Sequence, residues 1–237
     1  MRAPPSLYGG FWPRLTFLIF GLFLCAVGIV LFFESELGLP PWDVLHQGVA
    51  EQLEISFGIA NLVVSVLVLA LAWRLQAHIG LGTLLNALLI GTFVIALTSL
   101  AAVNGLSDES LALRIGLLPL ALACFGAGSA FYICASMGAG PRDSLMLVTS
   151  RRLGVRIGVA RTGIEIAALV AGFALGGTAG VGTLVFALGI GPAVEASFWL
   201  LARTPLAASE GTPLAAPSGV FARSASASAD ADLAPKN

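Results

Sequence analysis

The sequence predicts an all-α polytopic membrane protein with six transmembrane helices in two inverted three-helix repeats, each with a short interfacial or re-entrant helix. Three observations lead to this fold class. Of 237 residues, 57% are hydrophobic and 11% charged, whereas about a quarter of the residues in a soluble domain are charged. A short motif occurs twice, and the basic residues gather on one side of the expected topology. Such a chain can bury most of its surface only in lipid.

Six apolar runs are long enough to cross about 30 Å of hydrocarbon at about 1.5 Å per residue. They lie near residues 15–33, 57–73, 82–103, 112–137, 157–175 and 181–202. The first run is longer than the apolar core of a signal peptide and no small-x-small cleavage site follows it, so we expect a retained span. Three cysteines, Cys25, Cys124 and Cys134, fall in these runs. We expect them to be small buried side chains rather than a disulfide or a metal site.

A short helix is expected after the first span and again after the fourth, over residues 43–54 and 143–154. Pro41 and Asp43 begin the first copy, and Pro141 and Asp143 begin the second. Proline favours the first helical turn and aspartate is a strong N-cap residue, so we expect both carboxylates to cap free backbone N–H groups. Both segments are too polar to span, and they either lie in the interface or re-enter the membrane.

The short helices belong to an internal repeat. Gly38, Pro41, Asp43 and Leu45 recur as the same residue types 100 positions later, and the run Gly-x-Gly-Thr-Leu occurs at 80–84 and at 180–184. About a third of the positions from 38 to 94 are identical without a gap, too many for shared apolarity alone. Each copy contains three spans, an odd number, so the second copy would be inverted relative to the first, as in many transporters.

The repeat divides the chain into four parts. They are a cytoplasmic N-terminus (1–14), a first repeat (15–110), a second and inverted repeat (111–203), and a cytoplasmic tail (204–237). The tail is rich in Ala, Ser and Pro, cannot bury a core and is expected to be disordered.

The basic residues predict the orientation. With the N-terminus in the cytoplasm, eleven of the twelve Lys and Arg residues lie inside, and only Arg114 lies outside. This distribution satisfies the positive-inside rule and predicts a cytoplasmic-membrane protein with both termini inside. The first motif helix then lies among outside acidic residues, and the second among inside basic residues.

The best candidates for a polar site lie in the second span of each repeat. Glu165 is about two turns into the fifth span, and Arg161 lies one turn before it on the same face; Asn61 and Ser65 are their repeat partners. These residues either form a polar site between the repeats or, equally, include an ion pair that neutralises itself and only packs. Glu195 in the sixth span is a functional candidate by its position, or a carboxylate that snorkels to the interface.

The motif itself has two interpretations. We favour helix entry, with proline setting the start and aspartate capping it. Alternatively, the positive ends of two half-helices point into the protein and hold an anionic group, with Arg142 assisting on the inner side.

The third span of each repeat carries a small residue at every fourth position. The stripes are Thr83, Ala87 and Gly91, and Thr183, Ala187 and Gly191. Such a face lets another helix backbone come close. We favour plain helix packing over a pair of helices that line a path, although the two are compatible.

The sequence does not indicate an enzyme. His46 and His78 lie in separate loops on opposite sides, and neither metal-ligand spacing, nor a phosphate loop, nor a serine elbow occurs. We expect no metal, no cofactor and no nucleic-acid partner.

At these motifs the chain resembles the YczE-like bacterial membrane proteins and, more loosely, the YitT-type family. The residues that show the resemblance are 38–45, 80–86, 140–143 and 180–183, and the match covers about residues 15–202. The resemblance implies a multi-pass cytoplasmic-membrane protein of undefined activity and supplies no functional residues.

Two functions are therefore expected from different classes. The first is a transporter or channel-like protein for a small solute or ion. The second is a membrane scaffold or regulator whose inner basic helix, with Arg151 and Arg152, contacts a partner protein or anionic lipid. Besides the lipid bilayer, a second copy of the chain is a further candidate partner.

Overall fold

The structure is a computed structural model that describes residues 4–7, 9–77, 79–100 and 105–207. The helices are α1 (Phe11–Glu34), α2 (Pro41–Leu53), α3 (Phe57–Arg74), α4 (Leu81–Thr98), the short turn η1 (Leu106–Asp108), α5 (Leu111–Cys134), α6 (Pro141–Leu153), α7 (Ile157–Ala174) and α8 (Val181–Leu201). Six of them, all except α2, η1 and α6, are long and apolar enough to span a membrane. The predicted all-α class with six spans is confirmed.

The repeat is visible in the helix boundaries. The helices α1 to α4 begin at 11, 41, 57 and 81, and α5 to α8 begin at 111, 141, 157 and 181. The first helix starts four residues before the predicted span, at Phe11, and so includes Arg14. The predicted disordered tail falls mainly on residues 208–237, outside the described part of the chain.

The equivalent helices α1 and α5 form the central pair and run antiparallel. Near the start of α1, Arg14 Nε donates to the carbonyl oxygen of Ala135 at 2.6 Å, and near the start of α5, Arg114 Nε donates to that of Ser35 at 2.8 Å. Each arginine therefore neutralises the carbonyl end of the other helix. Gly21 lies against the backbone of Gly128, where no side chain would fit.

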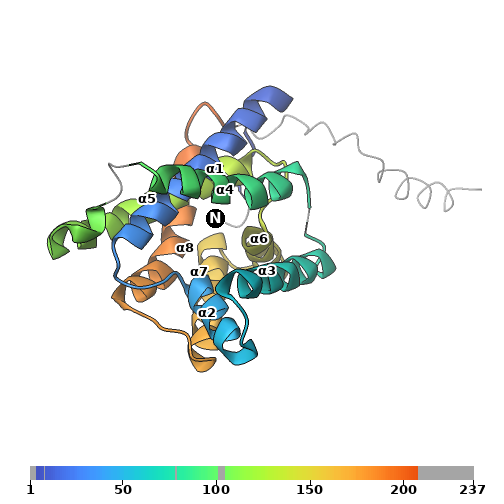
Figure 1. Cartoon of the computed structure of the whole chain (residues 1–237). Helices are drawn as coiled ribbons and strands as arrows, with labels where there is room; N and C mark the ends of the chain where they lie inside the picture. The colour runs from blue at the N-terminus through green and yellow to red at the C-terminus, as the bar shows by residue number, and fades with distance from the viewer. Residues whose placement is uncertain (1–3, 8, 78, 101–104, 208–237) are drawn as a thin grey trace, which may run out of the picture.

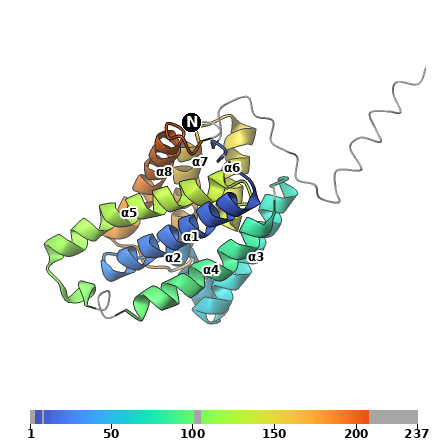
Figure 2. The same cartoon turned by 90° about the horizontal axis from the view of Figure 1, so that it is seen from above.

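Two groups of helices are built around this pair. The first is a layer in which α4 packs on α1, α1 on α5, and α5 on α8. The second is a ring in which α2, α3, α6 and α7 each pack on two of the others. Figures 1 and 2 show α1 and α5 side by side, with the ring on one side of them. The ring takes two helices from each repeat, so its interior is lined by both.

The loops that follow α1 and α5 cross to the other repeat. The backbone N–H of Gly182 donates to the carbonyl oxygen of Leu37 at 2.7 Å, and that of Gly82 donates to Met137 at 2.7 Å. Gly38 and Gly138 have φ of +139° and +108° beside these contacts, a conformation that suits glycine. The repeated Gly-x-Gly-Thr runs therefore join the two repeats.

The third spans of the two repeats, α4 and α8, differ in their packing. α7 packs along α8, but α3 and α4 are not packed against each other to a comparable extent. The stripe Thr183, Ala187 and Gly191 is buried. In the first repeat Thr83 is buried, but Ala87 and Gly91 are exposed. Helix packing therefore accounts for the stripe on α8 and leaves most of the stripe on α4 uncovered.

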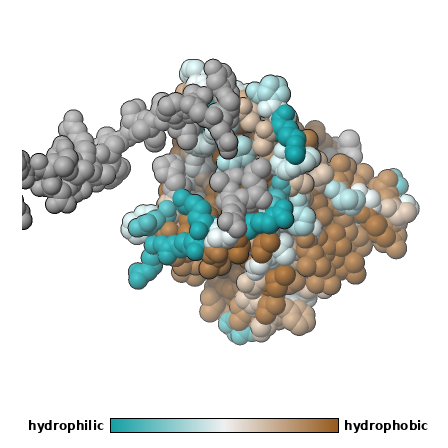
Figure 3. Space-filling view, turned by 180° about the vertical axis from the view of Figure 1, so that it is seen from behind, coloured by the Kyte–Doolittle hydropathy of each residue, from teal (hydrophilic) through white to brown (hydrophobic). Residues whose placement is uncertain are grey.

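The surface fits a lipid environment. Figure 3 shows a broad, continuous hydrophobic area, with the hydrophilic side chains gathered beside it. Trp12, Trp73 and Trp199 are exposed, and each lies within a few positions of an arginine at a helix end. Indole rings with adjacent cations are typical of the membrane interface.

The prediction that Asp43 and Asp143 are N-caps is wrong. Pro40 and Gly140 occupy the N-cap positions, Pro41 and Pro141 are the first helical residues, and neither cap has a side-chain hydrogen bond. Both carboxylates lie in the first turn of their helices, where Asp143 contacts Tyr132 of α5 and Arg161 of α7, and Asp43 contacts His46 of its own helix. His46, expected in a loop, is a buried residue of α2, and His78 lies outside the described residues.

Candidate functional site

Two short helices bring their first turns into the ring. The first turn of α2 is largely buried and that of α6 is buried at Asp143 and Ser144, whereas the last residues, Leu53 and Leu153, are 59% and 69% exposed. The guanidinium of Arg142 lies over the ring of Trp42, 5.0 Å from its centroid. Positions 42 and 142 are 100 apart, so equivalent positions of the two copies of the motif contact each other through their side chains.

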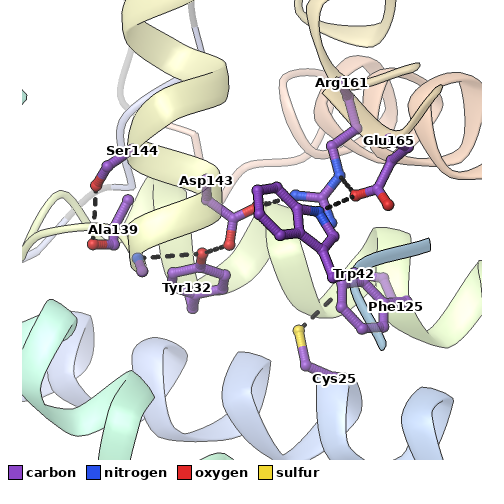
Figure 4. A network of polar contacts seen from close by, with 10 residues as sticks. Cys25, Trp42, Phe125, Tyr132, Ala139, Asp143, Ser144, Arg161 and Glu165 are labelled. Atoms are coloured by element: carbon purple, nitrogen blue, oxygen red, sulfur yellow. Dashed lines mark hydrogen bonds and ion pairs between the residues drawn. The ribbon is translucent and has the colours of Figure 1, made fainter. Parts of the chain in front are cut away.

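A buried arginine links two carboxylates in this region. Arg161 Nη1 bonds to Asp143 Oδ1, and Arg161 Nε lies 3.0 Å from Glu165 Oε1. Figure 4 shows Arg161 between the two acids. The exposed fractions of Asp143, Arg161 and Glu165 are 8%, 3% and 0%. The predicted ion pair between Arg161 and Glu165 is confirmed, and it extends to α6.

Asp143 is held from a second direction. The hydroxyl of Tyr132, near the end of α5, donates to Asp143 Oδ2, and the backbone N–H of Gly140 donates to the Tyr132 oxygen at 3.4 Å. Both oxygens of Asp143 therefore have donors. This carboxylate connects α5, α6 and α7 rather than capping its own helix.

Glu165 is connected to the first repeat. Trp42 Nε1 of α2 donates to Glu165 Oε1 at 3.2 Å. Its other oxygen, Oε2, is buried and has no hydrogen-bond partner among the described residues. A hydrogen bond to a charged acceptor is stronger than a neutral one, so this contact is a direct link between the repeats.

The network continues through Arg142 to His46 and Asp43. A terminal nitrogen of Arg142 lies 3.5 Å from His46 Nε2, and His46 Nδ1 lies 3.2 Å from Asp43 Oδ1. Arginine can only donate, so Nε2 accepts, and the Nδ1 proton points to Asp43. His46 therefore joins Arg142 of the second repeat to Asp43 of the first.

The predicted site residues divide into two groups. The structure brings together Arg161, Glu165, Arg142, Asp143 and Asp43, by the contacts described above. Ser65 donates to Asn61 Oδ1 at 3.2 Å on α3, and this pair has no described contact with the network.

Glu195 also lies outside the network. It is ion-paired with Arg156 at 2.6 Å, and Arg156 is largely exposed. This arrangement corresponds to the snorkelling interpretation.

Sequence reasoning missed three members of the network: Trp42, Tyr132 and His46. Trp42 lies within the repeated motif, and an aromatic side chain with a polar N–H group at the start of a short helix is a signal for it. Tyr132 is one of two tyrosines in the chain and needs a partner for its hydroxyl when buried. Its partner, Asp143, could be found only from the tertiary structure.

The network consists of charged and aromatic side chains. Within the described residues no group of three or more His, Cys, Asp or Glu side chains could hold a metal ion. Arg161 Cζ is 5.9 Å from the Phe125 ring centroid, so an aromatic ring lies beside the guanidinium. Buried charges of both signs, on helices from both repeats, suit a polar solute or an exchangeable ion.

Comparisons with known proteins were made with the whole chain. Residues 12–197 match a family described as a family of unknown function, DUF6198. An uncharacterised protein of Haemophilus influenzae is 37% identical over 205 residues, 86% of this chain and 91% of the relative. An uncharacterised membrane protein of Bacillus subtilis, YczE, is 31% identical over 181 residues, 74% of this chain and 80% of the relative. No solved structure matches.

Proposed function

Because the chain belongs to the DUF6198 family of unknown function and is homologous to YczE, we propose a function from its own buried site. The protein is a transporter or channel-like protein for a small polar solute or ion. The observation that carries this proposal is the charged network of Asp143, Arg161 and Glu165 and its bond to Trp42 of the other repeat. Ionisable groups inside spans are costly and mark ion and solute pathways.

The proposal includes an inverted repeat. Its support is the antiparallel packing of α1 and α5 together with the constant spacing of 100 between equivalent helices. Re-entry of α2 and α6, with buried starts and exposed ends, suits the same arrangement. In inverted-repeat transporters, substrate sites lie where such broken helices meet.

Movement is proposed from the unequal packing of the repeats. A Cβ atom on Gly158 would lie 2.8 Å from the carbonyl oxygen of Gly191, whereas one on Gly58 or Gly91 would meet nothing within 4 Å. In the proposed cycle, α3 and α4 close through Gly58 and Gly91 while α7 and α8 separate. The two states would expose the network to opposite sides.

The proposed location is the cytoplasmic membrane with both termini inside. The distribution of arginine supports it. Exposed Trp12, Trp73 and Trp199 support it too, because in this topology all three lie at the inner interface, and Arg203 lies over the Trp199 ring.

Reconstitution tests the proposal. Liposomes that contain the purified protein should show flux for a member of a panel of small organic anions, amines, amino acids and inorganic ions. Glu165→Ala should reduce that flux to the level of empty liposomes, because it removes the link to Trp42 and leaves Arg161 with one partner. Glu195→Gln, a matched change of a carboxylate outside the network, should retain it. Absence of flux across the panel would contradict the proposal.

A scaffold or regulator remains the second candidate. It is favoured by Arg151 and Arg152, which are both exposed at the end of α6. Arg151 also lines a cavity of about 260 Å³ with Ser144 and Leu147. A stoichiometric partner that co-purifies with the protein and is lost with Arg151→Glu and Arg152→Glu together would support this function over transport.

A further inference from the structure

The buried network holds more acid than base. Its buried charged residues are two carboxylates, Asp143 and Glu165, and one guanidinium, Arg161, whereas Asp43 and Arg142 are partly exposed and of opposite charge. One negative charge therefore has no counter-charge within the network. Buried charges are expected to be paired, so the site lacks one positive charge.

The hydrogen bonds indicate which carboxylate oxygen lacks a positive partner. Both oxygens of Asp143 have donors, from Arg161 and Tyr132, and Asp43 has His46. Glu165 Oε2 is the carboxylate oxygen that is buried without a partner in the described part of the chain. The residue is 0% exposed. An ionised oxygen in this position loses its water without gaining a protein donor.

We propose that Glu165 is a proton-binding site and that the proton is the ion coupled to the transport function proposed above, on which this inference rests. The proton comes from water, binds Glu165 Oε2, and returns to water from the same atom. A metal cation fits less well, because it needs several oxygen ligands and the oxygens of Asp143 are engaged. Protonation makes the network neutral.

The charged groups around Glu165 come from three helices. Helix α2 contributes Asp43 and His46, α6 contributes Arg142 and Asp143, and its own helix α7 contributes Arg161 one turn earlier. Helix α8, also packed on α7, carries Glu195 as its single charged residue, and this side chain is paired with Arg156. The two arginines favour the ionised carboxylate, and the two aspartates favour its protonation.

Proton binding would act on the contact between the repeats. Trp42 donates to Oε1 of Glu165, and a neutral acid accepts a weaker hydrogen bond than a carboxylate. A proton on Glu165 also leaves Arg161 with Asp143 as its charged partner. The same event therefore loosens α2 of the first repeat from α7 of the second.

Trp42 is a built-in reporter of this proton. The other tryptophans, Trp12, Trp73 and Trp199, are 74%, 69% and 53% exposed, whereas Trp42 is 5% exposed. Replacing these three by phenylalanine leaves Trp42 as the single indole and removes no buried contact. The fluorescence of this parent protein in detergent is measured from about pH 4 to pH 8, where carboxylates and histidine titrate.

The parent should show one sigmoidal change in Trp42 emission. Glu165→Gln should abolish it and hold the emission at the low-pH value at every pH, because glutamine mimics the protonated acid. His46→Gln and Glu195→Gln should keep the transition. If Glu165→Gln does not fold, Glu165→Asp should shift the midpoint of the transition.

Three results would overturn the proposal. They are a parent without a transition, a transition that persists unchanged in both Glu165 variants, and a transition that His46→Gln alone removes. The measurement needs no transport. A protein with the transition but without flux in liposomes would refute the proposed function and leave the proton site standing.

Discussion

In the second repeat α7 packs along α8, whereas α3 and α4, the equivalent helices of the first repeat, are not packed in this way. Of the most apolar stretch of each helix, 44% is buried in α7 and 39% in α8, but 17% in α3 and 11% in α4. Gly58 and Gly91 are identical to Gly158 and Gly191, yet they face open space. The same residues thus have two environments within one chain, open in the first repeat and packed in the second. The proposed movement requires the first repeat to adopt the packed environment.

The repeats also differ in what they contribute to the ring. The second supplies Asp143, Arg161 and Glu165, which are bonded to one another, whereas the equivalents of the last two, Asn61 and Ser65, bond to each other away from the network. The first supplies Trp42 and His46. The charged site is therefore asymmetric although the helices that carry it are repeated.

The largest expected effect comes from the network. Arg161→Met leaves two buried carboxylates without their shared counter-charge and should destabilise the protein by about 3–5 kcal/mol. The matched change in the first repeat, Asn61→Leu, alters an exposed side chain and should stay within about 0.5 kcal/mol of the parent. Thermal unfolding in detergent, followed by circular dichroism, measures both. Equal effects of the two changes would mean that the network does not distinguish the repeats.

A smaller effect is expected at the glycines. Gly158→Leu forces a side chain against the backbone of Gly191 and should cost about 1–3 kcal/mol in the same unfolding assay. Gly58→Leu should leave the unfolding temperature near that of the parent, because the site is open. If α3 and α4 close during transport, Gly58→Leu should nevertheless reduce flux in liposomes. A stable Gly58→Leu protein with full flux would contradict the proposed movement.

The sequence was sufficient for most of the fold, because apolar length and the motif spacing are local properties. It located the six spans, the two short helices and the pairing of equivalent positions. It could not show that Ala87 and Gly91 are exposed while Ala187 and Gly191 are buried, because the two stripes consist of the same residues. Their environments depend on which helices lie beside them.

The candidate site was predicted in part. Arg161 and Glu165 were recognised from their spacing of one turn. Local chemistry favours a cap role for Asp43 and Asp143, but Asp143 instead has the tertiary partners Arg161 and Tyr132, and Asp43 pairs with His46 one turn along its own helix. A charge-assisted contact in a buried site is more favourable than the hydrogen bond that an N-cap side chain makes to a free backbone N–H group. Only the fold shows where these partners lie.

Alternating packing of the two repeats can be measured by spin labels placed in each repeat of the protein in liposomes. Spin labels are placed in pairs at Ile59 and Leu88 and, in a second protein, at the equivalent Val159 and Leu188; all four positions are exposed. Cys25, Cys124 and Cys134 are first replaced by alanine. Distances are then measured by double electron–electron resonance in liposomes at low and high pH. The account predicts two distances for each pair, with the short 59–88 distance gaining population under the condition in which the short 159–188 distance loses it. A single distance for each pair, unchanged with pH, would contradict it.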